Sequence, residues 1–161
     1  MTIGILFVCT GNICRSPMAA GVFRAMTRRA GLADAFRIDS AGTSIGHVGQ
    51  SASRLAVEAA KRRGYDLSDH RARSLLSEDI ARFDYPLAMD RSHLAALRWM
   101  APRELVDRPQ MFLAYAPDAR SLDVPDPFGG RARDYEQALD LIEKGCASLL
   151  TRFRPLVETA R

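Results

Sequence analysis

Residues Val8–Pro17 read VCTGNICRSP and join two different sequence patterns. Before them lies the apolar run 3–8, which predicts a buried strand, and after them apolar residues recur at helical spacing to about residue 30. Pro17 is compatible with the first turn of a helix, where a missing N–H breaks no hydrogen bond. The stretch is therefore the loop between the carboxyl end of a first strand and the amino end of a first helix.

Strand and helix patterns alternate along the rest of the chain, which is typical of an α/β domain with a parallel sheet. Apolar runs predict further strands at 36–41, at 83–89 and near 104–106. Helical spacing predicts helices at 17–30, at 52–63, after a capping Asp90, and at 132–153. We expect a three-layer α/β sandwich in which helices flank a parallel sheet. Ligands of such sheets bind beyond the carboxyl ends of the strands, where Cys9 lies.

The composition is that of an ordinary globular protein, with 47% hydrophobic and 26% charged residues, and we expect a single domain spanning 1–161. No apolar stretch is long enough to cross a membrane or to form a signal peptide, and three unevenly spaced cysteines do not suggest disulfides. We therefore expect a cytoplasmic protein with no membrane partner. The net charge of +4 suits an anionic ligand. Because basic pairs such as Arg28-Arg29 and Arg62-Arg63 are scattered, we expect them on solvated helix faces and expect no nucleic-acid partner.

Cys9 lies where free backbone N–H groups and the helix dipole favour an anion. Gly11 permits a positive φ and Asn12 tolerates one, while the planar guanidinium of Arg15 can hold two oxygens of a phosphate group. The same positive field favours the thiolate of Cys9, the reactive form of cysteine. The loop lacks the Gly-Lys-[Ser/Thr] ending of a nucleotide P-loop. We predict a nucleophile beneath a phosphate cradle made by Thr10, Gly11, Asn12, Ile13, Cys14, Arg15 and Ser16.

A phosphocysteine route also needs an acid for the leaving group and then a base for water. Asp126, in VPDPFGG (Val124–Gly130), is the candidate, since two prolines stiffen this segment and loops at one edge of a sheet meet in space. An Asp between prolines is also a common turn residue, so spacing alone leaves both interpretations open.

The other candidate side chains have less specific interpretations. Cys14 either packs as a small apolar residue or forms a reversible disulfide with Cys9. Cys146 lies on the apolar face of the last helix and is expected in the core. His47 and His93 are expected at the surface. No second Cys or His pair lies at zinc-ligand spacing, so no metal site is predicted.

These motifs closely resemble those of the low-molecular-weight protein tyrosine phosphatases. That family carries V-C-x-G-N-x-C-R-S-P near its amino terminus, here Val8–Pro17, and an Asp-Pro motif late in the chain, here Asp126-Pro127. Family-like sequence also stands at DSAGTS (Asp39–Ser44), HRARSL (His70–Leu75) and FDYPLAMD (Phe83–Asp90). The resemblance therefore covers nearly the whole chain.

The resemblance implies a four-stranded parallel sheet and assigns roles to individual residues. Cys9 corresponds to the nucleophile, Arg15 to the phosphate clamp and Asp126 to the acid. Ser16 corresponds to the hydroxyl that eases departure of the thiolate, and Asn12, Ser40 and His70 to a network that holds the loop. No metal or organic cofactor is implied.

The sequence departs from the family around the rim of the pocket, which we expect to include Ile13, Gly46, His47 and Phe128. Where many members have an aromatic residue, this chain has Ile45-Gly46-His47, and where many have two tyrosines it has Phe128 and Gly129. We therefore expect a wider pocket with weaker stacking on a phosphotyrosine ring.

The interpretation favoured by these features is hydrolysis of phosphotyrosine in proteins, or of small aryl phosphates, by a monomer or weak dimer. Protein arginine phosphatases resemble this chain but tend to have Thr at the position of Ile13. Thiol-coupled arsenate reductases need further cysteines near the site, and Cys146 stands alone. A non-catalytic anion-binding module remains a third alternative, suggested by the basic charge.

Overall fold

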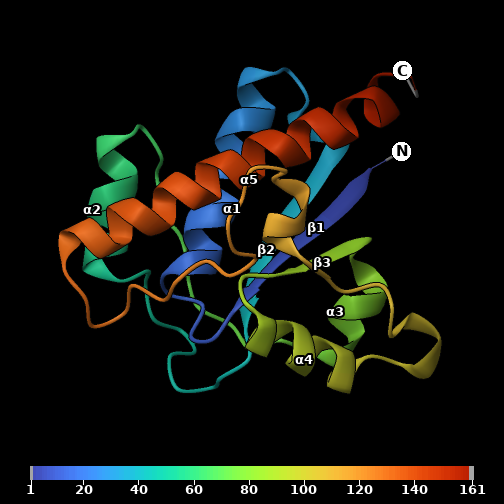
Figure 1. Ribbon diagram of the computed structural model, residues 1–161, viewed down its shortest axis with the longest axis horizontal. Coiled ribbons are helices and arrows are strands. Elements are labelled where there is room, and N and C mark those ends of the chain that lie inside the picture. Colours follow the sequence, from blue (N-terminus) through green and yellow to red (C-terminus); the bar gives the residue numbers. More distant parts are fainter. Residues whose placement is uncertain (1, 160–161) are drawn as a thin grey trace.

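The computed structural model describes residues 2–159, and its centre is a sheet of four parallel strands (Figure 1). The strands follow the order β2-β1-β3-β4 across the sheet. Their bounds are β1 (Ile3–Cys9), β2 (Phe36–Gly42), β3 (Tyr85–Ala88) and β4 (Gln110–Met111). Because β1 and β3 are neighbours, with Val8 beside Ala88, the loops that follow these two strands emerge side by side. The predicted four-stranded parallel sheet is confirmed.

Helices cover both faces of this sheet. The described residues form α1 (Arg15–Arg29), α2 (Arg54–Arg62), α3 (Ser77–Arg82), α4 (Arg91–Met100) and α5 (Ala132–Glu158), with short 3₁₀ helices at Ala33–Ala35, Arg103–Leu105 and Phe112–Tyr115. Figure 1 shows α1 and α5 on one side of the strands and α3 and α4 on the other. The expected three-layer sandwich is therefore confirmed.

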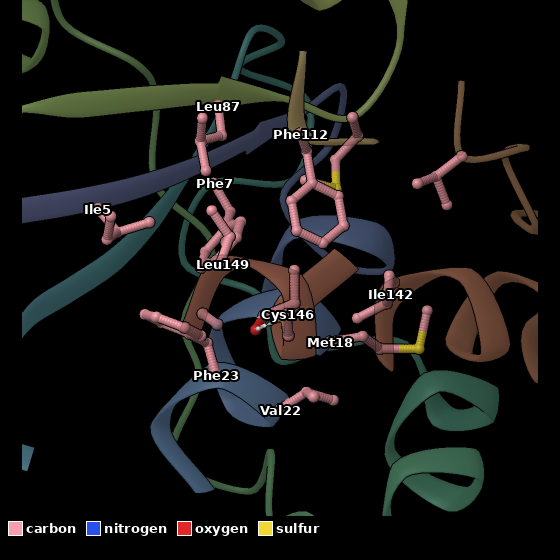
Figure 2. Close-up of a cluster of buried hydrophobic side chains, with 14 of the residues drawn as sticks. Ile5, Phe7, Met18, Val22, Phe23, Leu87, Phe112, Ile142, Cys146 and Leu149 are labelled. Atoms are coloured by element: carbon pink, nitrogen blue, oxygen red, sulfur yellow. Dashed lines mark hydrogen bonds between the residues drawn. The ribbon is translucent and has the colours of Figure 1, made fainter. Parts of the chain in front are cut away.

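The side chains of β1 alternate between two buried clusters, as successive residues of a strand must. Ile5 and Phe7 pack with α1 and α5, whereas Leu6 and Val8 pack with Ile80 of α3 and residues of α4. Figure 2 shows the larger cluster, in which Phe7 contacts Phe112 edge to face at a centroid distance of 5.5 Å. This packing fixes β1 from both sides and so fixes the position of Cys9 at its end.

The long helix α5 buries the face that the sequence pattern predicts. Its predicted core residues are all at most 3% exposed: Tyr135, Leu139, Ile142, Cys146, Leu149 and Phe153. Figure 2 shows Cys146 among the apolar side chains, in agreement with its predicted place in the core. The helix runs five residues beyond its predicted end at 153 and includes Pro155, because buried Val157 continues the same apolar face.

Other local predictions were wrong. The stretch 104–106 is not a strand but part of a 3₁₀ turn with no buried side chain, and the fourth strand lies at Gln110–Met111, where Met111 enters the core. Helix α3 was not predicted, because six residues are too few to show a helical period. Arg63 does not lie on a solvated face: it forms ion pairs with Glu136, Asp140 and Glu143 of α5.

Candidate active site

The loop between Cys9 and Arg15 is held by the end of β2. Thr43 N–H donates to the carbonyl of Cys9, and Ser44 N–H donates to that of Thr10, each at 2.9 Å. Asn12 has a φ of 56°, as expected for a residue that tolerates the left-handed region. Gly11 does not use the positive φ that glycine permits. A Cβ at this position would lie 2.9 Å from Cδ2 of His47, so a larger residue would displace the His47 ring at the rim of the loop.

A network around the buried side chain of Asn12 fixes the shape of the loop. Arg73 N–H donates to Oδ1 of Asn12 at 3.0 Å, which orients the amide so that Nδ2 donates to the hydroxyls of Ser16 (2.8 Å) and Ser40 (2.9 Å). Burial lowers the pKa of His70, and the neutral ring donates from Nε2 to the carbonyl of Asn12 at 2.6 Å. The structure therefore brings Ser40 and His70 to Asn12, whereas Arg73 was not foreseen from the sequence.

This network determines what Ser16 does next to Cys9. The Ser16 Oγ atom lies 2.9 Å from the Cys9 Sγ atom, and both residues are buried. Because Ser16 Oγ already accepts a hydrogen from Asn12, its own hydrogen is available for the sulfur. The hydroxyl can therefore donate to the Cys9 sulfur.

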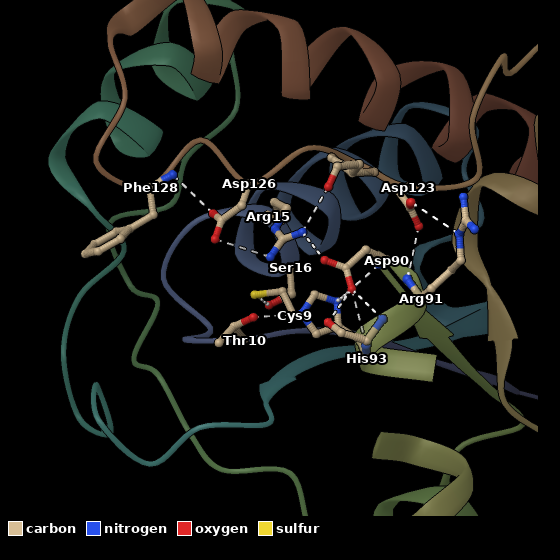
Figure 3. Close-up of polar contacts among 12 residues, drawn as sticks. Cys9, Thr10, Arg15, Ser16, Asp90, Arg91, His93, Asp123, Asp126 and Phe128 are labelled. Carbon is tan, nitrogen blue, oxygen red and sulfur yellow. Dashed lines mark hydrogen bonds and ion pairs between the residues drawn. The ribbon is translucent and has the colours of Figure 1, made fainter. Parts of the chain in front are cut away.

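The guanidinium of Arg15 is 3% exposed and held in place by two groups from distant loops. Its Nη1 donates to Oδ2 of Asp90 at 2.7 Å and to the carbonyl of Val124 at 2.9 Å. Its Nη2 lies 3.5 Å from Oδ2 of Asp126 (Figure 3). One edge of the guanidinium is thus fixed to the protein, while Nη2 lies on the side of the cavity.

Asp90 and His93 are more closely tied to the site than their sequence context indicated. Asp90 caps α4 as predicted, accepting from the N–H groups of Ser92 and His93, but the same carboxylate also binds Arg15. Burial raises the pKa of Asp90, but hydrogen bonds from Ser92 and Arg15 outweigh it and lower the value to about 2. His93 is 1% exposed, so its predicted surface position was wrong. Its Nε2 atom is 2.8 Å from the hydroxyl of Thr10, so the buried ring contacts the loop that follows β1.

A cavity of about 190 Å³ opens above the loop. Its lining residues come from three segments and are Cys9, Thr10, Gly11, Ile13, Cys14, Arg15, Ser44, His47, Asp126 and Phe128. The half-buried ring of His47 meets that of Phe128 edge to face at 5.7 Å, which closes one side of the mouth. Of the expected rim residues, Gly46 is not among those that line the cavity, whereas Ser44 is a lining residue that the sequence did not suggest.

Asp126 is brought over the cavity by the segment that follows Val124. Its Oδ1 accepts the N–H of Phe128 at 3.1 Å, and its side chain is 50% exposed. Gly129, with a φ of 78°, takes a conformation that favours glycine and completes the turn toward α5. The carboxylate therefore faces both solvent and the guanidinium of Arg15, at a position open to an incoming ligand.

The three cysteines are free thiols with different surroundings. Cys14 Sγ lies 3.3 Å from the hydroxyl of Ser53 and 3.5 Å from that of Tyr135, and burial raises the pKa of this thiol. Cys146 is fully buried, and its Sγ donates to the carbonyl of Ala19. Within residues 2–159, no group of three or more His, Cys, Asp or Glu side chains is arranged to hold a metal ion.

Comparisons with known proteins agree on one family. The family model described as low molecular weight phosphotyrosine protein phosphatase matches residues 4–158. A low molecular weight protein-tyrosine-phosphatase of Streptomyces coelicolor is 41% identical over 161 residues, covering 98% of each chain. The crystal structure of YfkJ from Bacillus subtilis superposes with a TM-score of 0.90 at 35% identity, covering 96% of each chain. A protein tyrosine phosphatase from Entamoeba histolytica gives a TM-score of 0.91 at 30% identity, covering 96% of this chain and 98% of that one.

Proposed function

The chain belongs to the low molecular weight phosphotyrosine protein phosphatase family, and we propose that Cys9, Arg15 and Asp126 perform its phosphotyrosine hydrolysis. It is a cysteine-dependent hydrolase of protein phosphotyrosine. The observation that supports these roles best is the shared cavity, in which a buried thiol, a fixed guanidinium and an accessible carboxyl group face the same space.

In the first step, the Cys9 thiolate attacks the phosphorus atom of the substrate and the bond from phosphorus to the tyrosine oxygen breaks. Arg15 and the N–H groups of the loop, at the amino end of α1, bind the phosphoryl oxygens. Asp126, as a carboxylic acid, gives its proton to the departing phenolate. The step yields a neutral tyrosine and a phosphocysteine at Cys9.

In the second step, water attacks the phosphorus atom and the S–P bond breaks. The Asp126 carboxylate takes a proton from the water, which restores the acid for the next cycle. The Ser16 hydroxyl, 2.9 Å from the Cys9 sulfur, stabilises the departing thiolate, and phosphate is released. The roles of Asn12, Ser40 and His70 are indirect, because they hold Ser16 and the loop in position.

The test compares hydrolysis of matched phosphotyrosine and phosphoarginine peptides by the wild type, Cys9→Ser and Asp126→Asn. We expect the wild type to cleave the phosphotyrosine peptide and Cys9→Ser to be inactive. Asp126→Asn should hydrolyse aryl phosphates more slowly, and its loss of rate should grow as the leaving group becomes more basic. A strong preference for phosphoarginine would overturn the proposed substrate but not the chemistry. Phosphate binding without hydrolysis of either peptide would leave only an anion-binding module.

We further propose a monomer or weak dimer of one phosphatase domain, 1–161, in the cytoplasm and without nucleic-acid partners. Three free thiols suit a reducing compartment. Arg62 and Arg63 both pair with Glu136, so this basic pair is partly neutralised within the protein. No described helix is long and apolar enough to span a membrane.

The buried Cys146 does not reach the cavity, which argues against a thiol relay of the arsenate reductase kind.

A further inference from the structure

The hydroxyl of Thr10 has one hydrogen-bond partner within residues 2–159, the imidazole of His93. The two side chains come from the catalytic loop and from α4, and their Oγ1 and Nε2 atoms are 2.8 Å apart. Thr10 lines the cavity together with Cys9, whereas His93 is 1% exposed. Figure 3 shows the pair beside Cys9. The steps described above use neither side chain.

The surroundings of His93 fix the direction of this hydrogen bond. The backbone N–H of Asp90 donates to Nδ1 at 3.1 Å, so Nδ1 is an acceptor. Burial and the charge of Arg15 lower the pKa of His93 to about 4. The carboxylates of Asp90, Asp126 and Asp123 raise this pKa but do not outweigh the burial. At neutral pH the ring is therefore neutral and carries its one hydrogen on Nε2. This N–H donates to Oγ1 of Thr10.

We propose that Thr10 binds the phosphoryl group through its side chain and that His93 is the positioning residue that aims the Thr10 hydroxyl into the cavity. A hydroxyl that accepts from His93 keeps its own hydrogen for another acceptor. No described residue accepts it, and the cavity that Thr10 lines is where the substrate phosphate binds. The inference rests on the proposed function, since the acceptor is a phosphoryl oxygen above Cys9.

The hydroxyl and the guanidinium make different contributions to binding. Arg15 supplies charge, whereas Thr10 supplies a neutral donor whose direction is set from behind by a buried ring. A hydrogen bond to a charged oxygen is stronger than one between neutral groups, and its loss lowers binding about tenfold or more. Thr10→Val, which keeps the shape of the side chain, is therefore expected to lower kcat/KM about tenfold.

His93 also contacts Asp90, which holds Arg15, so a substitution of His93 has two routes to the site. A double-mutant cycle separates them. If His93 acts by aiming the Thr10 hydroxyl, His93→Phe lowers kcat/KM in the wild type but has little further effect in Thr10→Val. If it acts through Asp90 and Arg15, the two losses multiply.

The experiment measures kcat and KM for p-nitrophenyl phosphate and the inhibition constant of inorganic phosphate. The variants are Thr10→Val, Thr10→Ser, His93→Phe, His93→Gln and the double variant Thr10→Val with His93→Phe. Leu97→Ala, in the same helix and fully buried, controls for loss of stability alone. We expect weaker inhibition by phosphate in Thr10→Val and a near-normal kcat/KM and inhibition constant in Thr10→Ser. His93→Gln should retain more activity than His93→Phe, because its amide nitrogen replaces Nε2.

Two results would overturn the inference while leaving the phosphatase intact: unchanged kcat/KM and phosphate inhibition in Thr10→Val, or independent losses in the double variant. If Leu97→Ala and His93→Phe lower kcat/KM equally at the same folded fraction, the role of His93 is structural only. An inactive wild-type enzyme would instead contradict the proposed function.

Discussion

Replacing Asp90 with asparagine removes the negative charge that faces Arg15 but keeps an oxygen for the cap of α4. In the wild type, Oδ2 of Asp90 accepts from Arg15 at 2.7 Å, and Oδ1 accepts from the N–H of Ser92 at 2.8 Å. The asparagine amide would retain the second interaction and place an NH₂ group against the guanidinium. Because Arg15 is 3% exposed, its charge would then have little compensation from water.

The size of the effect follows from the pKa of Asp90. The ordinary value is 3.8 and the folded value is about 2, a difference worth about 2 kcal/mol, since one pKa unit corresponds to about 1.4 kcal/mol. A carboxyl group whose pKa is lowered by folding stabilises the fold fully above its unfolded pKa. This contribution disappears as the pH falls from about 4 through about 2. Part of this shift comes from the hydrogen bond of Ser92, which asparagine keeps. Asp90→Asn should therefore lower the free energy of unfolding by up to about 2 kcal/mol at pH 7, and by much less at pH 2.

Urea unfolding of the wild type and of Asp90→Asn at pH 7, 4 and 2 measures this difference. Asp123→Asn is a matched control, because its ion pair with Arg91 is largely exposed and is expected to contribute less than about 1 kcal/mol. Activity at pH 7 should also fall in Asp90→Asn, through misplacement of the Arg15 guanidinium. An equal loss of stability at pH 7 and pH 2 would refute the charge argument, as would equal losses in the two variants.

Three further substitutions test other parts of the structure. Asn12→Ala removes the hydrogen bonds to Ser16, Ser40 and Arg73 and leaves an alanine at a φ of 56°. We therefore expect the free energy of unfolding in urea to fall by about 3 kcal/mol and kcat/KM to fall as well, and unchanged stability would contradict the network. Gly145→Ala places a Cβ against the ring of Phe112 and is expected to lower the free energy of unfolding by about 1–3 kcal/mol, with partial recovery in combination with Phe112→Leu. A thermal scan with unchanged Tm would argue against this close packing. Cys146→Ala should leave phosphatase kcat/KM unchanged, because this thiol is buried away from the cavity, and a marked loss of turnover would point to a role for the thiol in catalysis.

Much of the fold follows from local patterns in the sequence. The alternation of β1 and the helical spacing of α5 each identify a buried face without reference to the rest of the chain. The loop at Val8–Pro17 was also predictable, because a strand end, a residue suited to positive φ and a helix start are all local features. Two short elements, α3 and β4, escaped prediction because they hold too few residues to show a period.

The sequence by itself determined the chemistry that Cys9, Arg15 and Asp126 could carry out, and the tertiary structure decided which groups hold them. Asp90 is 75 residues from Arg15, and His93 is 83 residues from Thr10. Helical spacing and capping rules gave no reason to join either pair, and they placed His93 at the surface. These contacts exist because β1 and β3 are adjacent parallel strands, so that the loops at their carboxyl ends meet. The identity of each residue is local, but its partner is set by the order of strands across the sheet.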